Sequence, residues 1–240
     1  MTKAPSQSRI EITPSEHVTA LTHSAPAQDR SGICLILAHG AGANQTSTFM
    51  VRFATGLAAR GVDTVTFNFI YSERGKRLPD RNDKLDACYR RMIEAVRDGQ
   101  LSKSISHDKL AIGGKSMGGR IASQVAAAAP DGIAGLVFLG YPLHPPGHPE
   151  KLRSKHLPAI RAPMLFVQGS RDAFGAPAEL ERIFGGLQAP ADLVAVDGGD
   201  HSFKVSKKAP IPQEAVYESV LDEMVRWLHR SLGPRLGPRP

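Results

Sequence analysis

Short apolar runs alternate with longer amphipathic segments along this chain, and that alternation limits its fold more than any other feature. Residues 33–38 read ICLILA, a run that is too short for a helix and is followed at once by HGAG. Continuous apolar runs of this length are typical of strands buried on both faces of a sheet. Strands that alternate with helices favour an α/β fold, in which a parallel sheet carries helices on both faces.

The same pattern predicts the position of each element. We expect helices over residues 48–60, 84–96, 116–129, 178–184 and 213–232, and strands over residues 33–38, 62–71, 110–113, 134–139, 164–168 and 193–196. Alternating apolar and polar residues over 9–23 predict a short antiparallel pair of strands at the sheet edge. In such a sheet, functional residues are expected at the carboxyl ends of the parallel strands.

The length and composition of the chain fit one folded domain. Its 240 residues stay below the ~250–300 residues at which single hydrophobic cores stop growing. Hydrophobic residues make up 41% and charged residues 22%, which is typical of a globular protein and not of a disordered one. We therefore expect a single domain over residues 1–240, with residues 1–8 and 233–240 as flexible tails.

Neither a membrane nor a nucleic acid is expected as a partner. No apolar stretch approaches the ~18–20 residues that cross a bilayer, and residues 1–18 lack the apolar core of a secretory signal. The formal net charge is +7, but the basic residues are spread along the chain rather than gathered into one run. These observations predict a cytoplasmic protein whose oligomeric state the sequence leaves open.

Residues 114–118 read GKSMG, a G-x-S-x-G pattern at the predicted junction between a strand and a helix. In such a junction the serine adopts a strained backbone conformation that lifts its hydroxyl clear of the sheet. Two other interpretations are a helix-capping serine and a phosphate-binding loop. The phosphate-binding pattern requires glycine where this chain has Lys109, and the position between strand and helix favours Ser116 as a nucleophile.

Two residues further along the chain fit the roles that a nucleophilic serine needs. The serine requires a base that takes its proton, and the base requires an acid that holds its tautomer. Asp172 follows the predicted strand over 164–168, and His201 follows the predicted strand over 193–196, which is the order expected for this topology. Taken singly, Asp172 could cap a helix and His201 could lie on the surface. Asp200 is the main competitor as the acid, but a sequence neighbour rarely points the right way to orient the ring.

The reaction also needs N–H donors for the negatively charged oxygen of the tetrahedral intermediate. Met117 follows the nucleophile and supplies the first donor. For the second we expect Ala41 in HGAG, because small residues let the main chain approach the substrate. We interpret His39 in the same segment as a brace of this loop. This chemistry requires neither a cofactor nor a metal.

Five segments together resemble the α/β-hydrolase superfamily: HGAGAN, GGKSMGGR, GYPLHPPG, QGSRDAFG and DHSF. The resemblance covers residues 10–232 and includes a small bacterial branch similar to the hydrolase-like domains of testis-expressed protein 30 and of a chromatin NSL-complex subunit. It implies the α/β-hydrolase fold, with Ser116, Asp172 and His201 in the triad positions. Dienelactone hydrolases are more distantly similar, but they use a cysteine nucleophile where this chain has Ser116, so a lactone substrate is not implied.

The segment between the strands predicted at 134–139 and 164–168 holds nothing long enough for a large helical lid. The pocket is therefore expected to be open, and Tyr141 and His144 are our candidates for substrate contact. Three basic side chains could attract an anionic group or could simply be solvated: Arg74, Lys76 and Arg153.

These features predict a serine hydrolase that cleaves the carboxylic ester or thioester of a small-molecule acyl substrate through an acyl-enzyme on Ser116. Two alternatives stay open. One is a noncatalytic binding module that retains the fold and presents its loops to a partner protein. The other is a peptidase or an acyltransferase that uses the same three residues.

Overall fold

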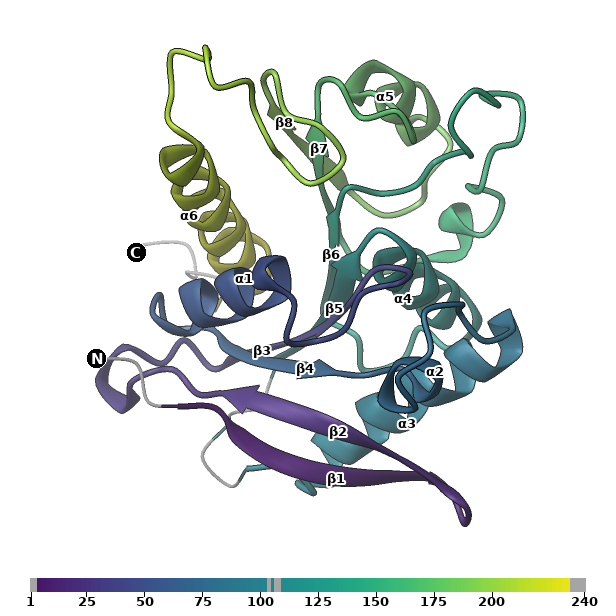
Figure 1. The fold of residues 1–240 in the computed structure, drawn as a ribbon, viewed down its shortest axis with the longest axis vertical. Coiled ribbons are helices and arrows are strands. Elements are labelled where there is room, and N and C mark those ends of the chain that lie inside the picture. The colour runs from purple at the N-terminus through teal and green to yellow at the C-terminus, as the bar shows by residue number, and fades with distance from the viewer. Residues whose placement is uncertain (1–3, 103–104, 106–108, 234–240) are drawn as a thin grey trace, which may run out of the picture.

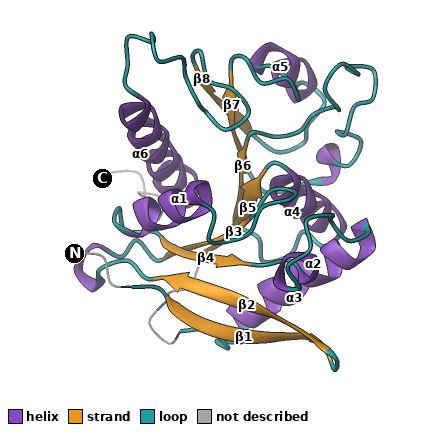
Figure 2. Ribbon diagram, viewed as in Figure 1, coloured by secondary structure: helices purple, strands orange, loops and turns teal. Residues whose placement is uncertain are grey.

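The chain folds around one eight-stranded sheet (Figure 2). This computed structural model describes residues 4–102, 105 and 109–233. Its strands are β1 Ser6–Thr13, β2 Glu16–His23, β3 Ile33–Ala38, β4 Asp63–Phe67, β5 Lys109–Lys115, β6 Gly135–Leu139, β7 Met164–Gly169 and β8 Ala191–Val196. They lie side by side in the order β1-β2-β4-β3-β5-β6-β7-β8. Strands β3 to β8 are parallel, whereas β2 pairs antiparallel with both β1 and β4. Strand β8 therefore forms one edge of the sheet.

Helices cover both faces of the sheet (Figure 1). They are α1 Thr48–Ala58, α2 Ile70–Glu73, α3 Asn82–Arg97, α4 Met117–Ala128, α5 Pro177–Phe184 and α6 Gln213–Leu232, with short 3-10 helices η1 Ala27–Asp29 and η2 Leu157–Ala159. Helices α1 and α6 contact each other on one face, and α3 and α4 contact each other on the other. Two separate apolar cores result, one around Phe53 and Trp227 and the other around Tyr89 and Ile121. Burial of large side chains on both faces stabilises the sheet.

The parallel register brings the carboxyl ends of several strands to the same edge of the sheet. Ala38 at the end of β3 pairs with Gly114 of β5, and Lys115 pairs with Leu139 of β6. Gly169 at the end of β7 pairs with Val196 of β8 in the same way. The segments that follow these strands consequently meet above the sheet, where the sequence places its candidate functional residues.

The predicted α/β architecture is confirmed, including the antiparallel strands at the N-terminal edge and the lack of a large lid. All residues of the segment 140–163 are described, and η2 is the only helix in it. No helix of the described residues combines the length and apolar character that a bilayer crossing requires.

Two boundaries differ from the prediction. Residues 6–8 were expected in a flexible tail but begin β1, where Ser6 pairs with Thr22 of β2. At the other end, residues 234–240 of the predicted tail lie outside the described residues. The strand predicted over 62–71 ends at Phe67, and its last apolar residues start α2, because a short apolar run does not separate a strand from a buried helical turn.

Candidate active site

Ser116 occupies a sharp turn between β5 and α4. Its backbone has φ 52° and ψ −117°, in the left-handed half of conformational space that residues other than glycine rarely adopt. Close packing holds the turn in place, since a Cβ atom on Gly114 or on Gly118 would lie 2.5 Å or 2.4 Å from the carbonyl oxygen of Ala38. Ser116 N–H also donates to the Leu139 carbonyl at 3.0 Å. The strained turn that the G-x-S-x-G pattern predicts is therefore present.

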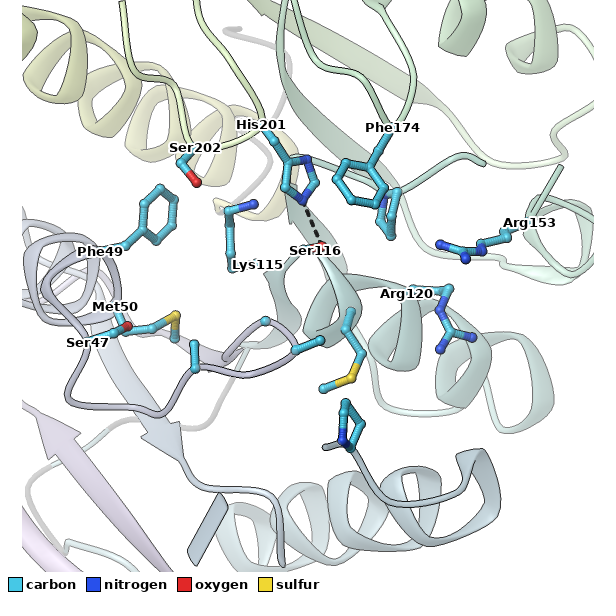
Figure 3. Close-up of a pocket in the computed structure, with 16 residues that line it drawn as sticks. Ser47, Phe49, Met50, Lys115, Ser116, Arg120, Arg153, Phe174, His201 and Ser202 are labelled. Carbon is cyan, nitrogen blue, oxygen red and sulfur yellow. Dashed lines mark hydrogen bonds between the residues drawn. The ribbon is translucent and has the colours of Figure 1, made fainter. Parts of the chain in front are cut away.

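His201 bridges Ser116 and Asp172. Its Nε2 lies 2.8 Å from Ser116 Oγ (Figure 3). Its Nδ1 lies 2.7 Å from Asp172 Oδ2. A carboxylate only accepts hydrogen bonds, so Nδ1–H donates to Asp172 and leaves Nε2 free to accept the serine proton. The Phe174 ring lies beside the imidazole, with the two ring centroids 4.3 Å apart. This arrangement is able to activate a serine hydroxyl.

Asp172, and not Asp200, is the carboxylate that is hydrogen-bonded to the His201 ring. The Asp172 side chain is fully shielded from solvent and accepts hydrogen bonds from Gln168 Nε2 and from Phe174 N–H, both at 2.8 Å. Asp200 instead accepts from the main-chain N–H groups that follow His201. Asp200 thus shapes the loop that carries the histidine, while Asp172 orients its ring.

Ser116 and His201 border a cavity of about 840 Å³. Ala41 and Met117, the two predicted oxyanion donors, both line it. Met117 is the first residue of α4, and the N–H groups of a first helical turn lack intrahelical acceptors and favour negative charge. The structure therefore brings both predicted donor residues to the same cavity as Ser116.

His39 directly precedes Gly40, which lines the cavity. It is fully buried, and burial lowers its pKa to about 4, so the ring is neutral at ordinary pH. Its Nδ1–H donates to the Gly40 carbonyl at 2.8 Å, and its Nε2 accepts from Phe69 N–H at 3.1 Å. The first bond fixes the ring within the loop after β3, and the second ties that loop to the segment after β4, which is the bracing role that we expected.

The two predicted substrate contacts do not reach the cavity. Tyr141 is fully buried, and its hydroxyl donates to the Arg153 carbonyl at 2.8 Å. His144 is buried as well and lies 3.2 Å from a carboxylate oxygen of Glu179. The loop folds inward at these positions, so Pro142 and Arg153 line the cavity instead.

Sequence reasoning missed several side chains that the structure places in or behind the cavity, and three of them are Lys115, Arg120 and Gln168. Lys115 and Arg120 line it, and Gln168 lies behind it, with its side-chain amide bonded to both Tyr141 and Asp172. Gln168 carries a usable signal, because it is a polar residue at the end of an otherwise apolar strand. Arg120 follows Ser116 by one helical turn, and that spacing places it on the same side of the helix as the serine.

Comparisons with known proteins agree with this architecture. A family model described as an alpha/beta hydrolase domain matches residues 31–229. An alpha-beta serine hydrolase homologue from Coxiella burnetii has a TM-score of 0.72 at 19% identity, over 95% of this chain and 98% of that one. Est1E from Butyrivibrio proteoclasticus, in a structure with ferulic acid bound, gives 0.71 at 16% identity, over 91% and 98%. A dienelactone hydrolase from Anabaena variabilis gives 0.68 at 21% identity, over 96% and 100%. At these identities the structural likeness establishes the fold.

Proposed function

Because the chain belongs to the alpha/beta hydrolase domain family, we propose that it is a serine hydrolase that cleaves a carboxylic ester or thioester through an acyl-enzyme on Ser116. One observation carries the proposal. Ser116 Oγ, His201 and Asp172 form a continuous pair of hydrogen bonds of 2.8 Å and 2.7 Å beside a cavity. An ordinary surface serine has no such base within reach.

In the proposed reaction, Ser116 Oγ attacks the carbonyl carbon while its proton passes to His201 Nε2. Asp172 stabilises the imidazolium that forms, and the N–H groups of Ala41 and Met117 donate to the oxyanion. His201 then gives the proton to the departing alcohol or thiol, and the acyl group remains on Ser116. A water molecule gives a proton to His201 and attacks this acyl group; the acid is released, and His201 returns the proton to Ser116 Oγ.

The open cavity favours small or extended acyl substrates over long buried lipids, because the described residues form no large helical lid over it. Est1E, which shares this fold, has been solved with ferulic acid, a carboxylic acid, and that observation supports an ester of a carboxylic acid as the substrate class. We also propose that the protein acts in the cytoplasm. We further propose that it belongs to the branch similar to the hydrolase-like domains of testis-expressed protein 30 and of a chromatin NSL-complex subunit.

The direct test is intact-mass analysis after treatment with an uncharged fluorophosphonate, which reports nucleophile activation without a chosen substrate. We expect one adduct on the wild type and none on Ser116→Ala. Ser47→Ala is the matched control, since Ser47 also lines the cavity but its side chain has no histidine partner among the described residues.

An unlabelled wild type, or labelling that persists in Ser116→Ala, would contradict the proposal. An unlabelled protein would favour the binding-module alternative. If labelling succeeds, product analysis with peptide and alcohol acceptors separates an esterase from a peptidase or an acyltransferase.

A further inference from the structure

The cavity beside Ser116 is lined by cations and by no carboxylate. Among the described residues that line it are Lys115, Arg120 and Arg153, and none is an aspartate or a glutamate. A concave site lined by charges of one sign concentrates ligands of the opposite sign. The cavity therefore has a built-in preference for negative charge that the hydrolytic chemistry does not itself require.

Arg120 and Arg153 lie on one side of Ser116, opposite Phe49 (Figure 3). Both side chains are half-buried. Within the described part of the chain neither guanidinium forms an ion pair, and Arg120 has only the neutral side-chain oxygen of Asn82, at 3.1 Å, as a side-chain acceptor. Burial and then repulsion by Arg153 lower the pKa of Arg120, so the two cations are close enough to oppose each other.

Three other arginines of the described residues are neutralised. Arg52, Arg60 and Arg74 each donate to a carboxylate, at 2.5 Å, 2.6 Å and 2.7 Å. Two adjacent half-buried guanidinium groups without a carboxylate are costly unless an anion joins them. The counter-charge is missing at the cavity, where a bound anion would supply it.

The main chain holds Arg153 at this position. Its N–H donates to the Leu143 carbonyl at 2.7 Å, and its own carbonyl accepts from the buried Tyr141 hydroxyl at 2.8 Å. Arg120 is held by helix α4, one turn after Ser116. Both guanidinium groups are thus presented by ordered backbone, as a binding site for a planar anion requires.

We propose that Arg120 and Arg153 form a subsite for a carboxylate on the substrate, so that this hydrolase acts on esters that carry a free acid group. The inference rests on the proposed function of the same cavity. Guanidinium groups match carboxylates through paired N–H donors, which gives orientation as well as attraction. Because Arg120 is only one helical turn from the nucleophile, the acid group lies a few bonds from the scissile carbonyl.

The test uses two pairs of aryl esters whose members differ only in whether a carboxylate is free or methylated. In para-acetoxybenzoate and its methyl ester, the charge is in the leaving group. In mono-para-nitrophenyl adipate and its methyl ester, the charge is in the acyl group. For each pair, the ratio of kcat/KM for the free acid to kcat/KM for the methyl ester measures recognition of the anion. Because both values come from the same protein sample, a loss of folded protein lowers both and leaves the ratio unchanged.

We expect the wild type to favour the free acid in at least one pair by about 10–100-fold, as hydrogen bonds to charged groups typically give. Arg120→Gln and Arg153→Gln should each move that ratio toward one. Arg182→Gln is the matched control, because Arg182 is exposed on α5, has no ion pair among the described residues and lies outside the cavity lining. Its ratio should equal that of the wild type.

A wild-type ratio near one in both pairs, or ratios unaffected by both glutamine variants, would overturn the subsite. If a glutamine variant does not fold, Arg120→Lys and Arg153→Lys replace it. Lysine keeps the charge but loses the paired N–H donors, so the proposal requires a lower ratio in each lysine variant than in the wild type. Fluorophosphonate labelling separates the two proposals. A wild type that is labelled but shows no preference contradicts only the subsite, whereas an unlabelled wild type contradicts the hydrolase.

Discussion

Lys115 carries a positive charge into the interior of this protein, and its replacement by methionine should stabilise the fold. The side chain is only 8% exposed, and its Nζ has no hydrogen-bond partner among the described residues. Nζ faces the Phe49 ring, whose centroid lies 5.7 Å away. Burial lowers the pKa of Lys115 from 10.5 to about 8, and attraction to Asp172 and Asp200 only partly opposes that effect.

The size of the effect follows from this pKa. Between pH 8 and 10.5 the unfolded chain keeps a proton on this lysine that the folded protein has lost, so the free energy of unfolding rises with pH across this window. At 1.36 kcal/mol for each pH unit, the charged amine destabilises the folded state by about 3 kcal/mol at pH 7. Methionine has a similar unbranched shape without the charge, so Lys115→Met should recover about 3 kcal/mol at pH 7.

Urea unfolding of the wild type and Lys115→Met from pH 7 to pH 10 measures this difference. We expect the advantage of the variant to fall to about 2 kcal/mol by pH 9 and to about 1 kcal/mol at pH 10. Exposed Lys207→Met serves as the control and should change the free energy of unfolding little at any pH. An advantage that does not vary with pH, or a variant less stable than the wild type at pH 7, would refute the reasoning.

Three further substitutions test the site and its supports. Asp172→Asn should leave the fold intact but lower kcat on esters by about 10⁴-fold, because the amide cannot hold the imidazole in its productive tautomer; steady-state kinetics beside a circular dichroism spectrum checks both parts. Tyr89→Phe removes the hydroxyl that accepts from buried Gly113 N–H at 2.9 Å, and should lower the free energy of unfolding by about 1–3 kcal/mol in urea titrations. Gly118→Ala places a Cβ 2.4 Å from the Ala38 carbonyl oxygen. We therefore expect the free energy of unfolding to fall by about 1–3 kcal/mol and the variant to form no fluorophosphonate adduct. Unchanged labelling in that variant would mean that the turn tolerates the displacement.

Periodicity and motif position predicted most of the architecture and the residues around His201. Strand β3 and helix α6 match their predicted bounds, because an uninterrupted apolar run and a long amphipathic segment are both strong local signals. Ser116 and Asp172 were placed correctly near His201 because each follows a strand whose carboxyl end is fixed by the parallel register.

The cavity wall was predicted less well because it depends on how an irregular loop packs. Tyr141 was expected at the substrate but turns inward, against the rings of Phe138 and Phe166. Burying an aromatic ring removes a large apolar area from water, which favours the inward orientation even in a loop. Arg153 reaches the cavity from the same loop. No periodic pattern distinguishes these two orientations, since each depends on contacts with residues distant in the sequence.

The edge position of β8 has a consequence for how the protein loses activity when it is heated. The segment that carries His201 follows this strand, which pairs with β7 alone and has mostly half-exposed or exposed side chains. Strands of this kind open locally at a lower free energy than central strands, so β8 and the loop after it should separate before β5 does. The nucleophile would then remain on an intact core without its base. Thermal inactivation should therefore precede global melting, and the amide hydrogens of β8 should exchange with solvent faster than those of β5.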